Sequence, residues 1–160
     1  MCIGIEFFLG GERRAVYFDS RAPKLPVRLR GGAIAFYGWG ARSTAFYEAG
    51  NVAGWGAKFP ETGYAPLEDI RAGKWEWLEP RPVRIFAARF IQVNSWQVPC
   101  YFALKAGEFI QGLLAHIEPH HTRVYVVTVP LPVEHAQEEW EWPRIIRQRE
   151  RRGQPPNPQI

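Results

Sequence analysis

The sequence begins with Met1-Cys2, and a cysteine in this position can do chemistry that an internal cysteine cannot. Removal of the initiator methionine leaves Cys2 with a free α-amine and a thiol on adjacent carbons. The amine forms a Schiff base with an aldehyde, and the thiol then closes a five-membered ring on the same carbon. Ordinary pKa values of about 8 for the amine and about 8.5 for the thiol leave a reactive fraction of each at neutral pH. The alternative is that Cys2 is only the second residue of a frayed terminus.

The remaining residues that could do chemistry form no strong motif. The sequence has no phosphate loop, zinc signature or serine nucleophile elbow. His120 and His121 are expected in a surface turn, and His135 lies among glutamates on a helix-prone stretch. Cys100 stands in a strand-like run and is expected to be a buried apolar residue. We therefore expect neither a metal ion nor a cofactor.

Length and composition favour one β-rich domain. The 160 residues predict a single domain over 1–148, followed by a basic, proline-rich tail over 149–160 that we expect to be disordered. The aromatic fraction of 14% favours a β-rich core, with exposed stacking surfaces as the alternative. The net charge of +4 is compatible with nucleic-acid binding. With no long apolar run and no signal peptide, we expect a cytoplasmic protein with no membrane partner.

Short β-prone runs separated by glycine pairs predict strands and hairpins. One hairpin is expected around Gly10-Gly11 and a second around Gly31-Gly32. The first joins residues 3–8 to 14–18, and the second joins 26–30 to 33–37. Further strands are expected at 83–93, 99–104, 109–116 and 123–129, with 99–104 and 109–116 paired as a hairpin.

Helices are expected to be few and short. Residues 65–72 predict a helix that ends at Gly73, and 133–142 predict a second helix. The stretch 144–152 is expected to be a helix or a strand, and 38–64 a long ordered loop. The predicted fold class is α+β, a β-rich curved sheet or partly closed barrel with two or three short helices.

Several stretches in this order resemble the SOS-response-associated peptidase family, also called the abasic-site-processing family, whose members begin Met-Cys. Residues 25–40 resemble the family's proline-valine hairpin that ends in Trp-Gly, and 64–69 resemble its Asn-Ala-Arg-X-Glu-Thr stretch. Residues 83–115 resemble its central strands, and 124–129 with 139–146 resemble its closing pair. The central stretch agrees with the family at Trp96, Pro99, Tyr101, Phe102, Gly112 and Leu113.

The resemblance implies that the partner is single-stranded DNA carrying an abasic site, whose ring-opened sugar presents an aldehyde. Cys2 would be the covalent nucleophile and would form a thiazolidine that shields the lesion. The peptidase activity of the family is the removal of the leading methionine. Trp39 matches a family tryptophan that lies close to the DNA, where an indole could stack on an exposed base; packing in the core is the alternative. Candidate phosphate contacts are Arg42, Arg84 and Arg89.

This sequence departs from the family at the residues that assist the cysteine. The family asparagine falls on Tyr64, the glutamate on Ser95 beside Asn94, and the histidine on Glu139. Asn94, Ser95 and Glu139 are therefore the candidate assisting residues. The alternative function is that of a catalytically degenerate, phage-related homologue that serves as a nucleic-acid or protein interaction module. The sequence leaves the oligomeric state open.

Overall fold

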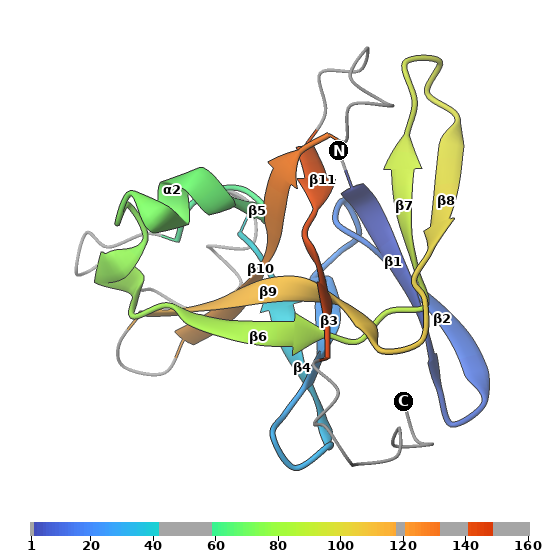
Figure 1. Ribbon diagram of the computed structural model, residues 1–160, viewed down its shortest axis with the longest axis horizontal. Helices are drawn as coiled ribbons and strands as arrows, with labels where there is room; N and C mark the ends of the chain where they lie inside the picture. Colours follow the sequence, from blue (N-terminus) through green and yellow to red (C-terminus); the bar gives the residue numbers. More distant parts are fainter. Residues whose placement is uncertain (1, 42–58, 118–120, 132–140, 149–160) are drawn as a thin grey trace.

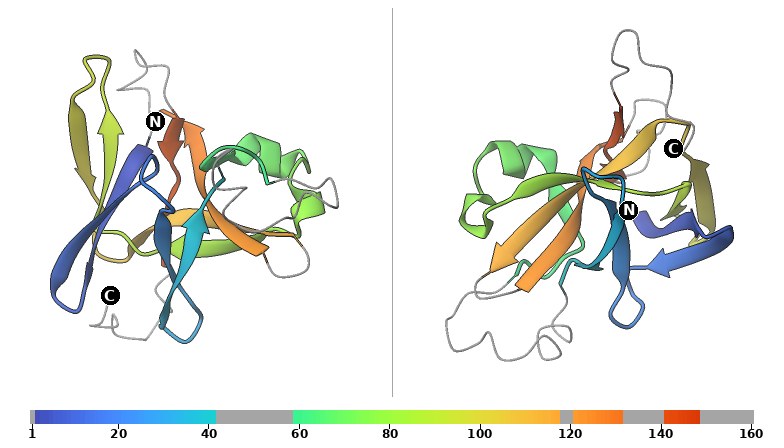
Figure 2. Two further views of the ribbon diagram at one scale, coloured as in Figure 1. Left: turned by 180° about the vertical axis from the view of Figure 1, so that it is seen from behind. Right: turned by 90° about the horizontal axis from the view of Figure 1, so that it is seen from below.

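The computed structural model describes residues 2–41, 59–117, 121–131 and 141–148, which form two β-sheets (Figure 1). The four-stranded sheet is antiparallel and has the order β2-β1-β7-β8. Its strands are β1 (Cys2–Leu9), β2 (Glu12–Tyr17), β7 (Arg89–Val93) and β8 (Pro99–Ala103). Figure 2 shows this sheet lying against one side of the second sheet.

The second sheet contains a closed ring of five strands. These are β3 (Lys24–Arg28), β4 (Ile34–Trp39), β6 (Arg81–Ile85), β9 (Glu108–Ile117) and β10 (His121–Pro130). The ring closes because β10 pairs antiparallel with β9 and parallel with β4. Three short strands extend it: β5 (Tyr64–Pro66) and β11 (Glu141–Pro143) pair with β10, and β12 (Ile145–Arg147) pairs with β9.

The predicted β-rich architecture is confirmed, and five of the strands form a closed barrel where a curved sheet or partly closed barrel was expected. Within the described ranges the helical segments are α2 (Leu67–Arg71) and the 3-10 turn η2 (Glu76–Leu78). The predicted helix over 65–72 is thus shorter than expected, and Gly73 follows it with a φ of 79°. The predicted helix over 133–142 and the tail over 149–160 lie outside the described residues, apart from 141–142 in β11. Residues 145–147 of the stretch 144–152 form a strand.

The first two predicted hairpins are confirmed, with strand ends shifted by a few residues. Leu9 pairs with Glu12 across Gly10 and Gly11, whose φ values are 60° and 79°. A two-residue turn with two positive φ angles matches the twist of the flanking strands, and glycine adopts it without steric cost. Around Gly31-Gly32 the paired strands are β3 and β4.

Two other strand predictions were wrong, because the chain changes sheet within them. The run 83–93 is divided between β6 in the barrel and β7 in the other sheet. Between them the Phe86 amide donates to Pro26 in one sheet and the Ala88 amide donates to Glu6 in the other. Likewise β8 pairs with β7, whereas β9 pairs with β6, β10 and β12, so residues 99–104 and 109–116 do not form a hairpin.

The core has two parts, one on each side of the barrel strands. The first lies between the two sheets and includes Cys2, Ile5, Trp39, Tyr64 and Phe90. The second lies where α2 and η2 cover the barrel; there the ring centroids of Trp75 and Tyr125 are 4.9 Å apart. Burial of these large apolar side chains supplies most of the favourable free energy of folding.

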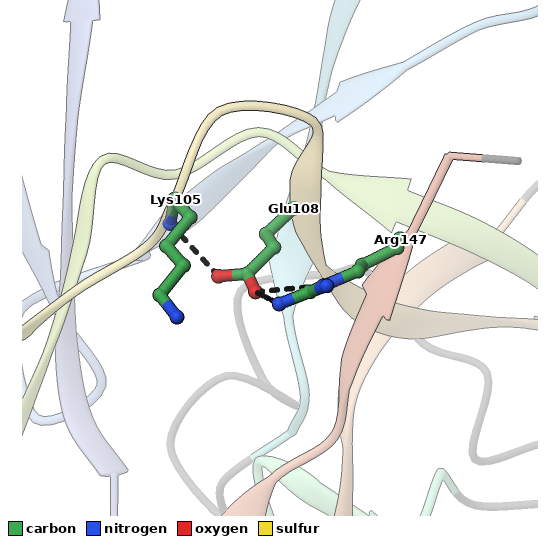
Figure 3. Close-up of polar contacts among 3 residues, drawn as sticks. All are labelled: Lys105, Glu108 and Arg147. Atoms are coloured by element: carbon green, nitrogen blue, oxygen red, sulfur yellow. Dashed lines mark hydrogen bonds and ion pairs between the residues drawn. The ribbon is translucent and has the colours of Figure 1, made fainter. Parts of the chain in front are cut away.

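Strand β12 pairs with β9 through its backbone, and the Glu108 carboxylate adds a side-chain contact at the end of this pair (Figure 3). Glu108 accepts a hydrogen bond from the Lys105 backbone amide at 2.8 Å and another from Arg147 Nε at 3.1 Å. The Glu108 side chain is 13% exposed and the Arg147 side chain 71% exposed. The Lys105 hydrogen bond, together with Arg147, holds the pKa of Glu108 below its ordinary value.

Candidate functional site

Cys2 is a fixed residue of the sheet. It is the first residue of β1, its Cα pairs with that of Gln92 on β7, and it is 1% exposed. The Tyr64 hydroxyl donates a hydrogen bond to the Cys2 carbonyl, and the thiol lies 3.4 Å from the Gly4 carbonyl oxygen. Cys2 is therefore held between the two sheets, and the frayed-terminus alternative is wrong for this residue.

Gln92 is the polar side chain that the fold places next to Cys2. The register of β1 with β7 shifts between Cys2 and Gly4, and beyond the shift Cys2 stands opposite Gln92; residues opposite one another in an antiparallel pair lie on the same face. Gln92 is 2% exposed, and neither its amide nitrogen nor its amide oxygen has a hydrogen-bond partner within the described part of the chain. A buried amide without partners costs about 1–3 kcal/mol. This cost is unexpected for a purely structural position and is consistent with a bound polar ligand.

Tyr64 connects Cys2 to the polar residues at the end of β10. Burial, and then the nearby Cys2, Asp19 and Glu141 side chains, raise the pKa of the Tyr64 phenol, which therefore remains a donor at neutral pH. Thr128 is 2% exposed, and its hydroxyl donates to the Glu141 carboxylate at 2.7 Å. A neutral donor and a carboxylate thus lie on the barrel side of Cys2.

The same burial makes Cys2 a weak nucleophile in this conformation. Removal from water raises the pKa of the Cys2 thiol to about 12. At pH 7 about one thiol in 10⁵ is then ionised, and the thiolate is the attacking species in ordinary cysteine chemistry. Reaction at Cys2 therefore requires that its neighbours move aside, or that a bound group accepts the thiol proton.

Asn94 and Ser95, the candidate assisting residues on this strand, lie in the turn between β7 and β8. The Asn94 side-chain oxygen accepts hydrogen bonds from the backbone amides of Trp96 and Val98, each at 2.9 Å. Asn94 thus shapes the turn, while the residue paired with Cys2 stands two positions earlier. Glu139 and Arg42 lie outside the described residues.

Trp39 is a core residue of this structure, which agrees with the core alternative and not with stacking on DNA. It is 1% exposed, and its indole nitrogen donates to the Gly63 carbonyl at 3.0 Å. Its ring centroid lies 5.3 Å from that of Phe18 and 6.3 Å from that of Tyr64. The indole therefore supports Tyr64 from within the core and presents no free face.

The two described candidate phosphate contacts lie on different sheets. Arg84 on β6 stacks over the Phe109 ring at 5.5 Å. Arg89 on β7 donates to Glu6 at 2.7 Å and lies 4.8 Å from the centroid of the Tyr101 ring. Because Glu6 is 6% exposed and already neutralises Arg89, this arginine has little charge to offer a phosphate.

Sequence reasoning missed Gln92, although a signal was present. In the run Phe90-Ile91-Gln92-Val93 the glutamine follows Phe90 by two positions, so both side chains point to the same face of a strand. A strand that buries the phenylalanine therefore also buries the amide. A polar residue on the apolar face of a strand indicates either a satisfied core contact or a ligand contact. Only the register with β1 identifies Cys2 as its neighbour.

Comparison of the chain with family models, with curated proteins and with solved structures gives no match. The family resemblance therefore rests on the sequence stretches quoted above. Within the described ranges, no group of three or more His, Cys, Asp or Glu side chains is placed to bind a metal ion. The helices found there are also too short and too polar to cross a bilayer.

Proposed function

We propose that the protein captures abasic sites in single-stranded DNA by covalent addition of the sugar aldehyde to Cys2. The observation that carries the proposal is the pairing of a buried Cys2 with the unpartnered amide of Gln92. An amide can both donate to and accept from the hydroxyl groups of an open sugar. The resemblance to the abasic-site-processing family supplies the class of substrate.

The chemistry needs only the aminothiol and the aldehyde. Hydrolysis of the Met1–Cys2 peptide bond frees the α-amine, which attacks the aldehyde carbon and expels one water to give an imine. The sulfur then bonds to the imine carbon, and the thiol proton moves to the imine nitrogen, which closes the thiazolidine ring. Because the imine nitrogen accepts the proton, ring closure does not require a free thiolate in advance.

The neighbours of Cys2 have distinct roles in this proposal. Tyr64 holds the Cys2 carbonyl and so orients the amine and thiol. Gln92 binds the hydroxyl that forms when the amine adds to the aldehyde. Because Cys2 is 1% exposed, the side chains over it must open before the sugar can reach it, and we expect this opening to limit the rate of crosslinking.

The test uses full-length protein whose loss of Met1 has been verified by mass spectrometry. It is mixed with a single-stranded oligonucleotide that carries one abasic site, and the products are separated on a denaturing gel. We expect a band with the mass of protein plus DNA less one water. The band should persist in Cys100→Ser and disappear in Cys2→Ala, and it should also disappear when borohydride has reduced the sugar aldehyde beforehand. Absence of the band from the processed wild type would overturn the proposal.

The burial of Cys2 favours a second function, that of a non-covalent nucleic-acid-binding module. A thiol with a pKa raised to about 12 has the character of a core residue. This function predicts equal affinity for intact and abasic single strands, with an affinity that falls steeply as salt rises. Fluorescence anisotropy with the two strands at several salt concentrations separates the two functions.

A further inference from the structure

The turn between β7 and β8 holds the most exposed large apolar side chain of the described residues. Trp96 is 84% exposed, and Val98 beside it is 52% exposed. Tryptophan is among the residues most enriched at the energetic centres of binding interfaces, because its large apolar surface gains most from contact. We refer to residues 94–98 as the Trp96 turn.

The Trp96 turn is rigid. The Asn94 side-chain oxygen accepts hydrogen bonds from the backbone amides of Trp96 and Val98. The Asn94 backbone carbonyl accepts a third hydrogen bond, from the Gln97 amide at 2.9 Å. Gln97 has a φ of 60°, the left-handed position that closes a three-residue hairpin loop. Because the backbone is already ordered, contact with the indole costs little further conformational entropy.

The Trp96 turn also lies at the same end of the sheet as Cys2. Gln92 pairs with Cys2, and the hairpin of β7 and β8 continues beyond the start of β1 (Figures 1 and 2). Trp96 lies four positions after Gln92, with β7 ending at Val93 and the turn beginning at Asn94, so the two residues are at most about 13 Å apart at about 3.3 Å per extended residue. A DNA strand with stacked bases covers that length in about four nucleotides, at about 3.4 Å each.

We infer that Trp96 stacks on an unpaired base two to four nucleotides away from the abasic sugar held at Cys2. This inference rests on the proposed function for the place of the lesion. The turn has no charged side chain over residues 93–99, so its contribution comes from the indole face and does not involve phosphate. Stacking of this kind accepts any base, because every base has a π-face.

The test compares Trp96→Ala with a matched exposed tryptophan. Trp77 is 55% exposed on η2, on the opposite side of the barrel from the hairpin (Figure 1). By fluorescence anisotropy with single-stranded DNA, we expect Trp96→Ala to weaken binding about tenfold and Trp77→Ala to leave it unchanged. Trp96→Phe should retain most of the affinity. The slope of affinity against salt should be the same in all variants, because no phosphate contact is lost.

A position-specific readout uses 2-aminopurine placed at successive positions on either side of the abasic site. Stacking should quench its fluorescence at one or two positions within about four nucleotides, and Trp96→Ala should remove that quenching. Unchanged affinity and quenching in Trp96→Ala would overturn the inference, as would a change in sedimentation without a change in DNA affinity, which would indicate a protein contact. If the wild-type protein binds single-stranded DNA through Trp96 but forms no crosslink, the proposed covalent capture is wrong and the proposed stacking by Trp96 is supported.

Discussion

The Cys2 and Glu108 regions both lie where a terminal strand pairs with its neighbour, but they differ in whether their polar side chains have hydrogen-bond partners. At the first, β1 meets β7 through buried Cys2 and Gln92, and the glutamine amide has no partner within the described residues. At the second, β12 pairs with β9, and the two carboxylate oxygens of Glu108 are bound by Lys105 and Arg147 (Figure 3). The second is close to solvent, while the first is sealed from it.

The difference separates a structural contact from a candidate site. At Glu108 both carboxylate oxygens already accept hydrogen bonds from Lys105 and Arg147, so the contact stabilises the fold. At Gln92 the fold tolerates an unsatisfied amide at a cost of about 1–3 kcal/mol. Sites that bind or react commonly retain such costs, because the missing partner is supplied by the ligand. Three predictions sharpen this contrast.

The largest effect should be on thiol labelling. In Cys100→Ser, which reports on Cys2, a disulfide reagent should react at least about 100-fold more slowly than in Cys2→Ser, which reports on the partly exposed Cys100. The raised pKa of Cys2 also means that the folded state keeps a proton that the unfolded state releases, so stability should fall as pH rises from about 9 toward 12. Equal labelling rates in the folded protein would show that Cys2 is not sealed.

The next effect should be on the free energy of unfolding when Gln92 is made apolar. Gln92→Leu keeps the approximate volume and removes two unsatisfied polar atoms, so we expect stabilisation by about 1–2 kcal/mol in urea unfolding, together with loss of crosslinking. Gln111 is the matched control, because its side-chain oxygen accepts a hydrogen bond from Arg144. Gln111→Leu should destabilise the protein. If both substitutions destabilise it, the Gln92 amide has a partner in the native state.

The smallest effect should be at Glu108. Because Arg147 is 71% exposed, solvent screens the pair, and Glu108→Gln should lower the free energy of unfolding at pH 7 by about 0.5 kcal/mol without changing crosslinking. The pKa of Glu108 is lowered on folding, so this stabilisation is complete above the unfolded value of about 4.3 and disappears as pH falls below it. Glu12→Gln, which removes an exposed ion pair with Arg14, is the control and should have no measurable effect. If the difference in free energy of unfolding between the wild type and Glu108→Gln did not change with pH, the charge of the Glu108 carboxylate would not be involved.

Sequence pattern predicted the elements better than it predicted their partners. The Gly10-Gly11 turn and the strands around it follow from local backbone preferences, as does the short helix that ends before Gly73. The run 83–93 has one continuous β-prone pattern, yet Phe86 and Ala88 donate to strands of different sheets. Periodicity is a property of one segment, whereas the choice of sheet depends on all the segments that compete for the same edge.

Sequence pattern was also a poor guide to the surroundings of the candidate site residues. The sequence singled out Cys2 because removal of Met1 would leave it with an amine beside a thiol. It could not rank the tryptophans: for Trp39 it left contact with DNA and packing in the core both open, and the structure buries this residue while it exposes Trp96 on a hydrogen-bonded turn. Burial depends on what packs over a side chain, and residues near in sequence do not determine that.

By itself, then, the sequence determined that the chain is β-rich and where its glycine turns lie, and it predicted an aminothiol at Cys2 once Met1 is removed. The tertiary structure decided that β10 closes the barrel by a parallel pairing with β4 and that Gln92 lies beside Cys2. The reason is physical: strand register between residues 90 positions apart is set by the packing of two sheets against a common core, and that packing is a property of the whole chain.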